Sequence, residues 1–337
     1  MEGNLDISVL LPVRNGGRFL GQALSSIQAQ VFSASVDLEI IAVDDGSTDE
    51  TPAILNRWTS RLPLSLHTTD ETSRGIVAAL NLGLEHARGT YIARMDADDI
   101  MYPERLAMQW HFMESRPDVD LCGTRVRCFH DEHPLSFGVH RYQEWNNRLL
   151  THDDMVRDLY IDCPMVHPTW FGRRSVFERL DGYRETNAAE DHDLIFRAVY
   201  GGYRLAKLPD ILLDWRDHAA RETRINPALK RTRLFRQKAW FFKRHDPLAT
   251  RPLLVFGVGR YGKHILDALI AEGLDVRGIV DPYNRYVRSR IRNLPVLSLG
   301  DPTPPDALLI NAYPVEGKPT PASVPYLENR LRRDWVL

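Results

Sequence analysis

Residues 91–100 read Tyr-Ile-Ala-Arg-Met-Asp-Ala-Asp-Asp-Ile, so an apolar run ends in three carboxylates. A short apolar run favours a buried strand of a parallel sheet. Open α/β sheets place ligands at the carboxyl ends of their strands, where Asp96, Asp98 and Asp99 would lie. Clustered carboxylates repel one another, and a divalent cation such as Mg²⁺ or Mn²⁺ neutralises them. The stretch predicts either a metal–diphosphate site or a solvated acidic turn.

The chain before this stretch alternates strand and helix patterns. Strands are expected at 7–12, 38–43 and 65–68, and helices at 19–29, 50–59 and 76–87. Ser47 or Thr48 is expected to cap the helix at 50–59, and Gly89 to stop the helix at 76–87. Such alternation predicts a doubly wound parallel sheet. Right-handed crossovers would then place the loops at 12–15, 44–48 and 96–99 along one rim.

The pattern loosens after Pro103. We expect a polar connection over 128–150 and a closing pair of short strands over 203–214. The remaining expected elements are a helix at 104–115, strands at 119–126 and 166–171, and a helix at 188–200.

Composition narrows the class of protein. The 337 residues are 43% hydrophobic and 26% charged, with a formal net charge of −2, which gives no reason to expect nucleic acid as a partner. No apolar run approaches twenty residues and no signal-peptide pattern opens the chain. Three cysteines cannot all pair, so free thiols and a cytoplasmic location are expected.

Residues 221–244 are rich in arginine and lysine with aromatic residues between them. The pattern predicts a basic amphipathic helix. One interpretation is peripheral contact with an anionic membrane at its inner face, near a lipid-linked acceptor. The alternative is an interdomain helix with buried aromatics and solvated cations. A linker up to residue 250 follows.

A fresh α/β pattern starts at Leu253 and includes Gly257-Val-Gly-Arg-Tyr-Gly262 between a predicted strand and helix. Asp281 ends the next predicted strand. This context fits dinucleotide binding, with NAD(P) as the cofactor. The alternative is a Rossmann-like accessory module that keeps the glycines for a tight turn.

Five motifs in order resemble those of family 2 glycosyltransferases with the GT-A fold. They are Val9–Asn15, Val43–Asp49, Asn81–Ile92, Asp96–Asp99 and Ala189–Leu194, within residues 6–220. The resemblance implies an α/β GT-A domain over 1–220 with a doubly wound, mostly parallel sheet. The basic helix and linker then occupy 221–250, and a small Rossmann-like α/β domain occupies 251–337.

The resemblance also implies a donor site. Asp44 would contact the nucleotide base, in a pocket lined by Pro12, Val13 and Asn15. Asp45 would be a second nucleotide contact or a turn residue bonded to the backbone of 46–48. The cofactor-binding candidates are Pro12, Val13, Asn15, Asp44, Asp45, Arg74, Asp96 and Ala97. Arg74 is either a cationic contact to base or diphosphate, or an ordinary solvated arginine.

Within the acidic cluster, the resemblance implies that Asp96 meets the ribose and that Asp98 binds the metal. Asp99 is expected to cap the following turn, and the alternative is that it supports the metal ligands from behind. His218 resembles a histidine that reaches back to the metal or diphosphate, with a structural histidine as the alternative.

The pair Glu190-Asp191 is the candidate for acid–base chemistry. Sugar transfer with inversion needs a general base opposite the leaving nucleotide. The resemblance assigns Asp191 as that base and Glu190 as the residue that orients the acceptor. The alternative is that both acids only favour a helix N-terminus.

The sequence therefore predicts an inverting, metal-dependent glycosyltransferase. It would move a sugar from a nucleotide-diphosphate sugar, expected to be a UDP-sugar, to a hydroxyl of a glycan or lipid-linked acceptor in bacterial surface polysaccharide synthesis. Two alternatives stay open: an NAD(P)-dependent nucleotide-sugar oxidoreductase or epimerase, and a non-catalytic nucleotide-sugar-binding scaffold.

Overall fold

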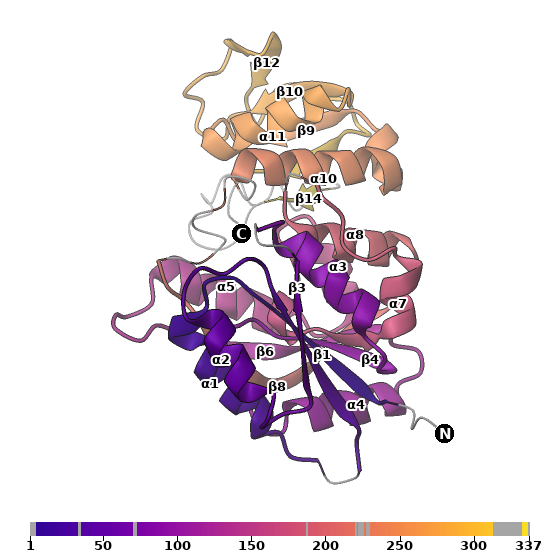
Figure 1. The fold of residues 1–337 in the computed structure, drawn as a ribbon. Helices are drawn as coiled ribbons and strands as arrows, with labels where there is room; N and C mark the ends of the chain where they lie inside the picture. The colour runs from indigo at the N-terminus through magenta and orange to yellow at the C-terminus, as the bar shows by residue number, and fades with distance from the viewer. Residues whose placement is uncertain are drawn as a thin grey trace. The chain divides into compact units, whose positions relative to one another are not determined.

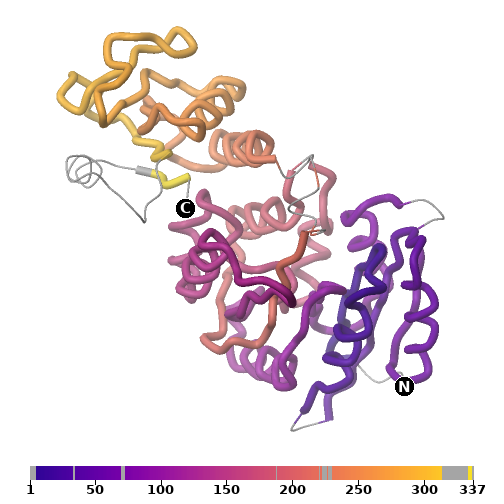
Figure 2. Tube along the Cα trace, turned by 90° about the vertical axis from the view of Figure 1, so that its left-hand side faces the viewer, coloured from indigo at the N-terminus to yellow at the C-terminus, as the bar shows by residue number. Residues whose placement is uncertain are grey.

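The protein forms two compact units (Figures 1 and 2). The computed structural model describes residues 5–32, 35–69, 73–186, 188–219, 221, 226, 230–312 and 332–335. The first unit comprises residues 1–156, 164–185 and 193–221. The second comprises 157–163, 186–192 and 222–337. Two short segments from the middle of the sequence therefore pack with the C-terminal part of the chain.

The first unit is built on an eight-stranded sheet in the order β3-β2-β1-β4-β7-β6-β8-β5. Its strands are β1 (Ile7–Val13), β2 (Leu38–Asp44), β3 (Leu64–Thr68), β4 (Tyr91–Arg94), β5 (Ile100–Met101), β6 (Leu121–Phe129), β7 (Phe171–Arg173) and β8 (Leu205–Arg216). Strands β1 to β4 pair only in parallel with one another, and β7 joins β4 antiparallel. The predicted mostly parallel, doubly wound sheet is confirmed.

Helices cover both faces of this sheet. They are α1 (Gly17–Gln28), α2 (Thr51–Trp58), α3 (Ile76–His86), α4 (Arg105–Ser115), α5 (Phe137–Arg148), α6 (His152–Asp158), α7 (Arg174–Arg179) and α8 (Glu190–Tyr200), with a 3₁₀ turn at His167–Thr169. Alternate residues of a strand face opposite sides. Val9 accordingly shares a core with Leu20 of α1 and Leu106 of α4. Leu10 faces the other side, where α3 packs. A Cβ added at Gly83 of α3 would lie 3.3 Å from Cδ2 of Leu10.

The expected pair of short strands over 203–214 is wrong, because β8 is one continuous strand of 12 residues. Its pairing with β6 shifts between Leu208, opposite Thr124, and Ile211, opposite Arg125. The exposed Pro209 and Asp210 have the sequence of a turn but form an irregularity inside the strand.

The expected connection over 128–150 is also wrong, since it contains α5. The polar residues of this helix bond the backbone of β6. Gln143 accepts a hydrogen bond from the Cys128 N–H at 2.6 Å, and the Asn147 amide pairs with both backbone groups of Val126. The polarity of the segment therefore reflects its pairing with a strand.

The predicted cap of α2 is wrong, whereas the predicted end of α3 is right to within one residue. Glu50, not Ser47 or Thr48, occupies the N-cap of α2 and makes no side-chain capping bond. Helix α3 ends at His86, before Gly89. A Cβ at Gly89 would lie 2.5 Å from the backbone N of Ser8, so close packing against β1 requires glycine there.

The second unit holds a six-stranded sheet in the order β11-β12-β10-β9-β13-β14. The strands are β9 (Leu253–Phe256), β10 (Val276–Val280), β11 (Arg290–Ile291), β12 (Leu294–Leu297), β13 (Leu308–Asn311) and β14 (Arg332–Asp334). All except β11 pair in parallel. Their spatial order, numbered along the chain, is 3-2-1-4-5, the order of dinucleotide-binding folds. Helix α11 (Arg260–Ala271) follows β9, and α10 (Arg231–His245) lies beside α11.

The predicted basic helix is α10, which begins at Arg231. Residues 222–225 and 227–229 of the predicted helix lie outside the described residues. Phe235, Phe241 and Phe242 are buried, and Trp240 is 37% exposed. Most of the aromatic surface that a membrane contact would need is thus inside the protein.

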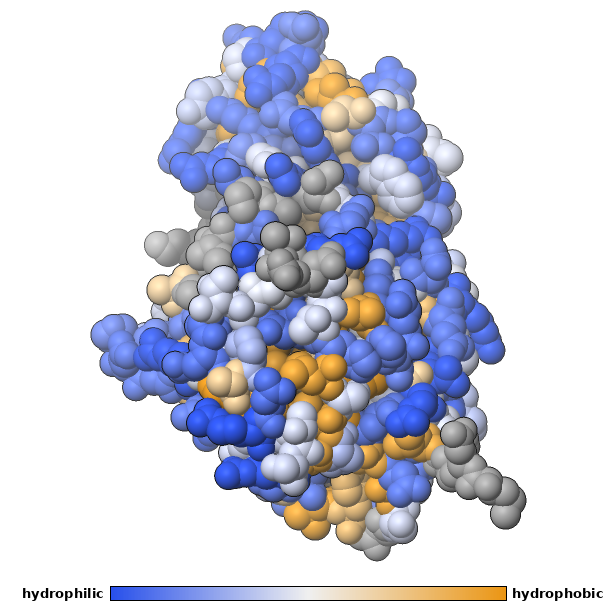
Figure 3. All heavy atoms as spheres, in the orientation of Figure 1, coloured by the Kyte–Doolittle hydropathy of each residue, from blue (hydrophilic) through white to orange (hydrophobic). Residues whose placement is uncertain are grey.

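The described helices include none with the length and hydropathy needed to cross a bilayer. The face in Figure 3 is largely hydrophilic, with hydrophobic side chains gathered toward the lower part of the first unit.

Candidate active site

The loops after β1 and β2 are bonded to each other along one rim of the first sheet. The backbone N–H of Asn15 donates to Ser47 Oγ at 2.8 Å, and Asn15 Oδ1 accepts from the Thr48 N–H at 2.8 Å. Asn15 has a φ of 49°, a left-handed conformation that asparagine tolerates. The predicted adjacency of loops 12–15 and 44–48 is confirmed. Pro12 and Val13 are buried beneath them.

Asp44 and Asp45 are both 4% exposed but have different partners. Asp44 Oδ1 accepts from the Ser47 N–H at 3.1 Å. Its second carboxylate oxygen has no hydrogen-bond partner within the described part of the chain. This leaves Asp44 with an oxygen that can accept an N–H from a ligand.

Asp45 organises the loop that enters α3. Its carboxylate accepts from the hydroxyls of Thr69 and Ser73 and from the backbone N–H groups of Arg74 and Gly75, at 2.5 to 2.9 Å. Burial acts to raise the pKa of Asp45, but these hydrogen bonds outweigh it and lower the pKa.

Asp45 was expected, as one alternative, to bond the backbone of 46–48. That alternative is wrong, because Asp44 accepts from the Ser47 N–H whereas Asp45 bonds residues at the start of α3. Arg74 presents an exposed side chain at the same loop.

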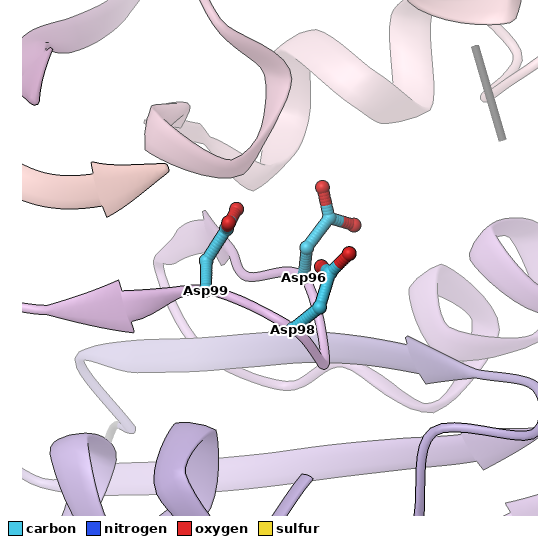
Figure 4. A group of neighbouring side chains, drawn as sticks. All are labelled: Asp96, Asp98 and Asp99. Carbon is cyan, nitrogen blue, oxygen red and sulfur yellow. The ribbon is translucent and has the colours of Figure 1, made fainter. Parts of the chain in front are cut away.

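The acidic cluster follows β4. One carboxylate oxygen from each of Asp96, Asp98 and Asp99 lies within 4.8 Å of the others, and the three side chains point to the same side of the loop (Figure 4). Asp96 accepts from Arg94 Nη2 at 2.7 Å. His218 Nε2 lies 2.8 Å from Asp98 Oδ2. His218, predicted from sequence to reach toward the metal or diphosphate, does meet the cluster through Asp98. Ala97 lies between the two half-buried acids.

Burial acts to raise the pKa of Asp98, but the hydrogen bond with His218 and the charge of Arg221 outweigh it and lower the pKa. Asp99 behaves oppositely. Burial, followed by the charges of Asp98 and Asp96, raises its pKa well above the usual range. Asp99 therefore loses its charge more readily than Asp98, first because it is fully buried and second because two like charges lie beside it.

The expectation that Asp99 caps the following turn is wrong. Its Oδ1 accepts from the backbone N–H of Arg216 in β8 at 2.8 Å. Its Oδ2 is buried and has no hydrogen-bond partner among the described residues. A buried, unsatisfied oxygen beside two other carboxylates fits the oxygen-rich ligand set that Mg²⁺ or Mn²⁺ prefers.

Arg216 is a site residue that sequence reasoning missed. Its Nε donates to the Asp98 carbonyl at 2.7 Å, and its guanidinium also bonds Gln22 and Asp131. The side chain is 2% exposed and lies between the Phe19 and Phe129 rings, 4.4 and 4.5 Å from their centroids. The sequence does place Arg216 two residues before His218, just after the predicted strand region, and this proximity could have indicated a site residue.

Glu190 and Asp191 form the first turn of α8 and belong to the second unit. Both are half-buried. Asp191 Oδ1 accepts from the His192 N–H at 2.6 Å. The predicted donor-site residues, by contrast, all belong to the first unit.

His167 is buried beside Tyr183, with 2.8 Å between Nε2 and the phenol oxygen. Burial, with a smaller effect of Arg94, lowers its pKa well below 6.5, so the imidazole stays neutral near pH 7.

The glycines of the second unit have a packing explanation. Gly257 has a φ of 119°, and a Cβ at Gly262 would lie 1.8 Å from the Gly257 carbonyl oxygen. Asp281 is fully buried, and its carboxylate accepts from the backbone N–H groups of Tyr283 and Tyr286 at 3.1 and 2.8 Å. The Asp281 carboxylate is thus bonded to its own turn, and nothing in the described residues supports NAD(P).

A doubly wound sheet with clustered acids on its rim is an arrangement that suits binding of a nucleotide diphosphate with a metal ion. The profile of "Glycosyl transferase family 2" matches residues 8–181. The chain belongs to this family and is a glycosyltransferase. It is similar to "Amylovoran biosynthesis glycosyltransferase AmsE" of Erwinia amylovora, with 32% identity over 195 residues, 58% of this chain and 69% of the relative.

Solved structures share the fold. The structure of S. aureus TarS 1-349 in complex with UDP-GlcNAc has a TM-score of 0.57 and 18% identity, covering 80% of this chain and 72% of that one. The mannosyltransferase PcManGT from Pyrobaculum calidifontis, in complex with GDP-Man and Mn²⁺, has a TM-score of 0.51 and 21% identity, covering 72% and 64%.

Proposed function

We propose that this protein is an inverting, metal-dependent glycosyltransferase that uses a nucleotide-diphosphate sugar. The observation that carries the proposal is the cluster of Asp96, Asp98 and Asp99 at the sheet rim, where one buried Asp99 oxygen finds no hydrogen-bond partner in the described parts of the chain. The acceptor would be a hydroxyl of a glycan or lipid-linked molecule in bacterial polysaccharide synthesis. The Amylovoran biosynthesis relative supports that setting.

The donor would lie along the rim formed by the 12–15, 44–48 and 96–99 loops. Asp44 would offer its second carboxylate oxygen to a base N–H, and a uracil N–H fits that acceptor. Asn15 fixes the shape of the base pocket through its bonds to Ser47 and Thr48. Asp96 would accept from the ribose hydroxyls. We favour a UDP-sugar, consistent with the UDP-GlcNAc complex of TarS, although PcManGT binds GDP-Man.

Asp98 and His218 would hold Mg²⁺ or Mn²⁺, as the donor set allows. When bound, the ion would neutralise charge on the departing diphosphate. Arg216 holds the Asp98 backbone in place through its bond to the Asp98 carbonyl.

Asp191 would act as general base. It would take the proton from the acceptor hydroxyl while the hydroxyl oxygen attacks the anomeric carbon and the bond to the diphosphate breaks. Attack from the side opposite the leaving group inverts the anomeric configuration. Glu190 would orient the acceptor. Cys122, Cys128 and Cys163 are buried thiols outside any disulfide, and they fit a reducing cytoplasm as the place of reaction.

The test measures release of the nucleotide diphosphate from a panel of UDP- and GDP-sugars with Mn²⁺, with Mg²⁺ and with chelator. We expect chelator, Asp98→Asn and Asp191→Asn each to lower kcat by at least about 100-fold. Asp118→Asn, a change at an exposed carboxylate, should leave turnover intact.

Full turnover without divalent metal or with Asp98→Asn would refute the metal site, and full turnover with Asp191→Asn would refute the base. Donor binding with no turnover on any acceptor would instead favour the scaffold alternative.

A further inference from the structure

The first turn of α8, which carries Glu190 and Asp191, is bonded to α10 within the second unit. Gln237 Nε2 of α10 donates to the carbonyl of Ala189 at 2.9 Å. Ala189 is the residue directly before Glu190. Helix α10 therefore contacts the backbone at the point where the acidic pair begins.

A second connection passes through residues 159–161, which also pack in this unit. His192 Nε2 lies 2.8 Å from the Leu159 carbonyl, and Lys238 Nζ donates to the Ile161 carbonyl at 2.7 Å. A carbonyl only accepts, so Nε2 of His192 carries the hydrogen. The residues on both sides of Glu190 and Asp191 are thus held. Gln237 bonds Ala189 directly, and Lys238 bonds the 159–161 segment, which accepts a hydrogen bond from His192.

Aromatic packing holds the same segment. The Tyr160 ring stacks on Trp335 with centroids 5.5 Å apart and an interplanar angle of 7°, and it meets the edge of Phe242 of α10 at 5.7 Å. The segment that receives the bonds from His192 and Lys238 is therefore itself packed against α10 and the residue that follows β14.

These polar side chains are costly to bury. Lys238 is 4% exposed and Gln237 is 8% exposed. Burial lowers the pKa of Lys238 to about 8, and the Gln237 Oε1 has no hydrogen-bond partner among the described residues. An apolar side chain of similar size would avoid both penalties. Stability alone does not account for these two residues. Their bonds give them a geometric role, because Gln237 bonds the residue before the acidic turn and Lys238 bonds the segment to which His192 is bonded.

We propose that Gln237 and Lys238 are positioning residues that hold the first turn of α8 so that the Asp191 carboxylate is correctly oriented. The inference rests on the proposed function, because it takes Asp191 as the general base. It makes the C-terminal unit part of the transferase machinery, since α10 sets the geometry of the proposed base.

The experiment compares Gln237→Leu, Lys238→Met and Asp191→Asn in the full chain, with the exposed Arg236→Ala on the same helix as the matched control. It measures kcat, the donor KM, the dissociation constant for UDP with Mn²⁺ and the melting temperature. A displaced base should lower kcat about 10- to 100-fold, while the donor KM and UDP affinity stay within about twofold of wild type. Arg236→Ala should behave as wild type.

Gln237→Leu also removes the unsatisfied Oε1, so it is expected to fold even if Lys238→Met does not, and it then decides the question alone. A kcat within about twofold of wild type for the folded variants, with Asp191→Asn inactive, would overturn the positioning role and leave the proposed function standing. An active Asp191→Asn would overturn the base assignment and the positioning role with it. A parallel loss of UDP affinity would also overturn it, because that points to general damage.

Discussion

Asp44 and Asp45 are neighbours in the sequence with different environments. Among the described residues, one carboxylate oxygen of Asp44 has no hydrogen-bond partner, whereas Asp45 accepts four hydrogen bonds, from Thr69, Ser73, Arg74 and Gly75. Asp45 is thus engaged in holding the loop that leads into α3. The same residue type has a different role because consecutive side chains at a strand end point to opposite sides and so meet different partners.

Asp45→Asn should destabilise the first unit. The amide nitrogen cannot accept, so one pair of donors, among Thr69, Ser73, Arg74 and Gly75, is left facing another donor. Such a loss costs about 1–3 kcal/mol of unfolding free energy. Chemical denaturation of the variant measures it, with Asp118→Asn as the exposed control. A denaturation midpoint equal to wild type would show that the loop does not need the charge.

Side-chain partners from distant strands were beyond sequence analysis. The sequence predicted that Asp96 and Asp98 would lie at a strand end, because an apolar run precedes them. It did not predict Arg216, which reaches Asp98 only because β8 crosses to the same rim. The same crossing explains why Asp99 bonds to β8 instead of its own turn.

At the scale of elements, periodic apolar segments were predictable and irregular ones were not. The alternation that predicts β1 to β4 and α1 to α3 arises from local burial patterns. Strand β8 was read as two strands because Pro209-Asp210 has turn chemistry, yet pairing with β6 continues on both sides. Helix α5 was not predicted because polar residues on the side that faces β6 bond the strand backbone, so the usual apolar periodicity is weak.

Gly262→Ala should damage the second unit, whereas Gly259→Ala should not. A Cβ at Gly262 would lie 1.8 Å from the Gly257 carbonyl oxygen, so the β9–α11 turn must shift. A Cβ at Gly259 meets nothing within 4 Å, and its φ of −67° suits alanine. We expect Gly262→Ala to cost more than about 2 kcal/mol.

Thermal melting followed by near-ultraviolet circular dichroism compares the two glycine variants. Equal melting temperatures would contradict the packing explanation of the glycine motif and return attention to a ligand at that turn.

At the scale of the whole molecule, sequence order and packing diverge. A boundary near residue 221 follows a change in composition, and such changes are visible in the sequence. The inclusion of 157–163 and 186–192 in the second unit depends on buried contacts with α10, such as those of Gln237 and Lys238. The sequence does not predict those contacts, because each acceptor is a backbone carbonyl, which every residue has.

Both units contain a buried neutral histidine, and this predicts how the whole protein responds to acid. Burial lowers the pKa of His167 in the first unit well below 6.5. Burial and the charge of Lys238 lower the pKa of His192 in the second unit to about 3. Unfolding exposes each imidazole, which then binds a proton below its ordinary pKa. The unfolded state therefore binds more protons between pH 6.5 and the lowered values, and stability falls as pH falls through this window.

Each histidine should contribute a slope of about 1.4 kcal/mol per pH unit within that window. His192→Gln should therefore flatten the loss of stability of the second unit between about pH 6 and pH 4, and His167→Gln that of the first. Denaturation at a series of pH values measures the slopes, with the exposed His140→Gln as control. Wild-type slopes in both variants would mean that other groups govern acid unfolding. A slope reduced by one proton in the corresponding unit would show that each imidazole is buried uncharged.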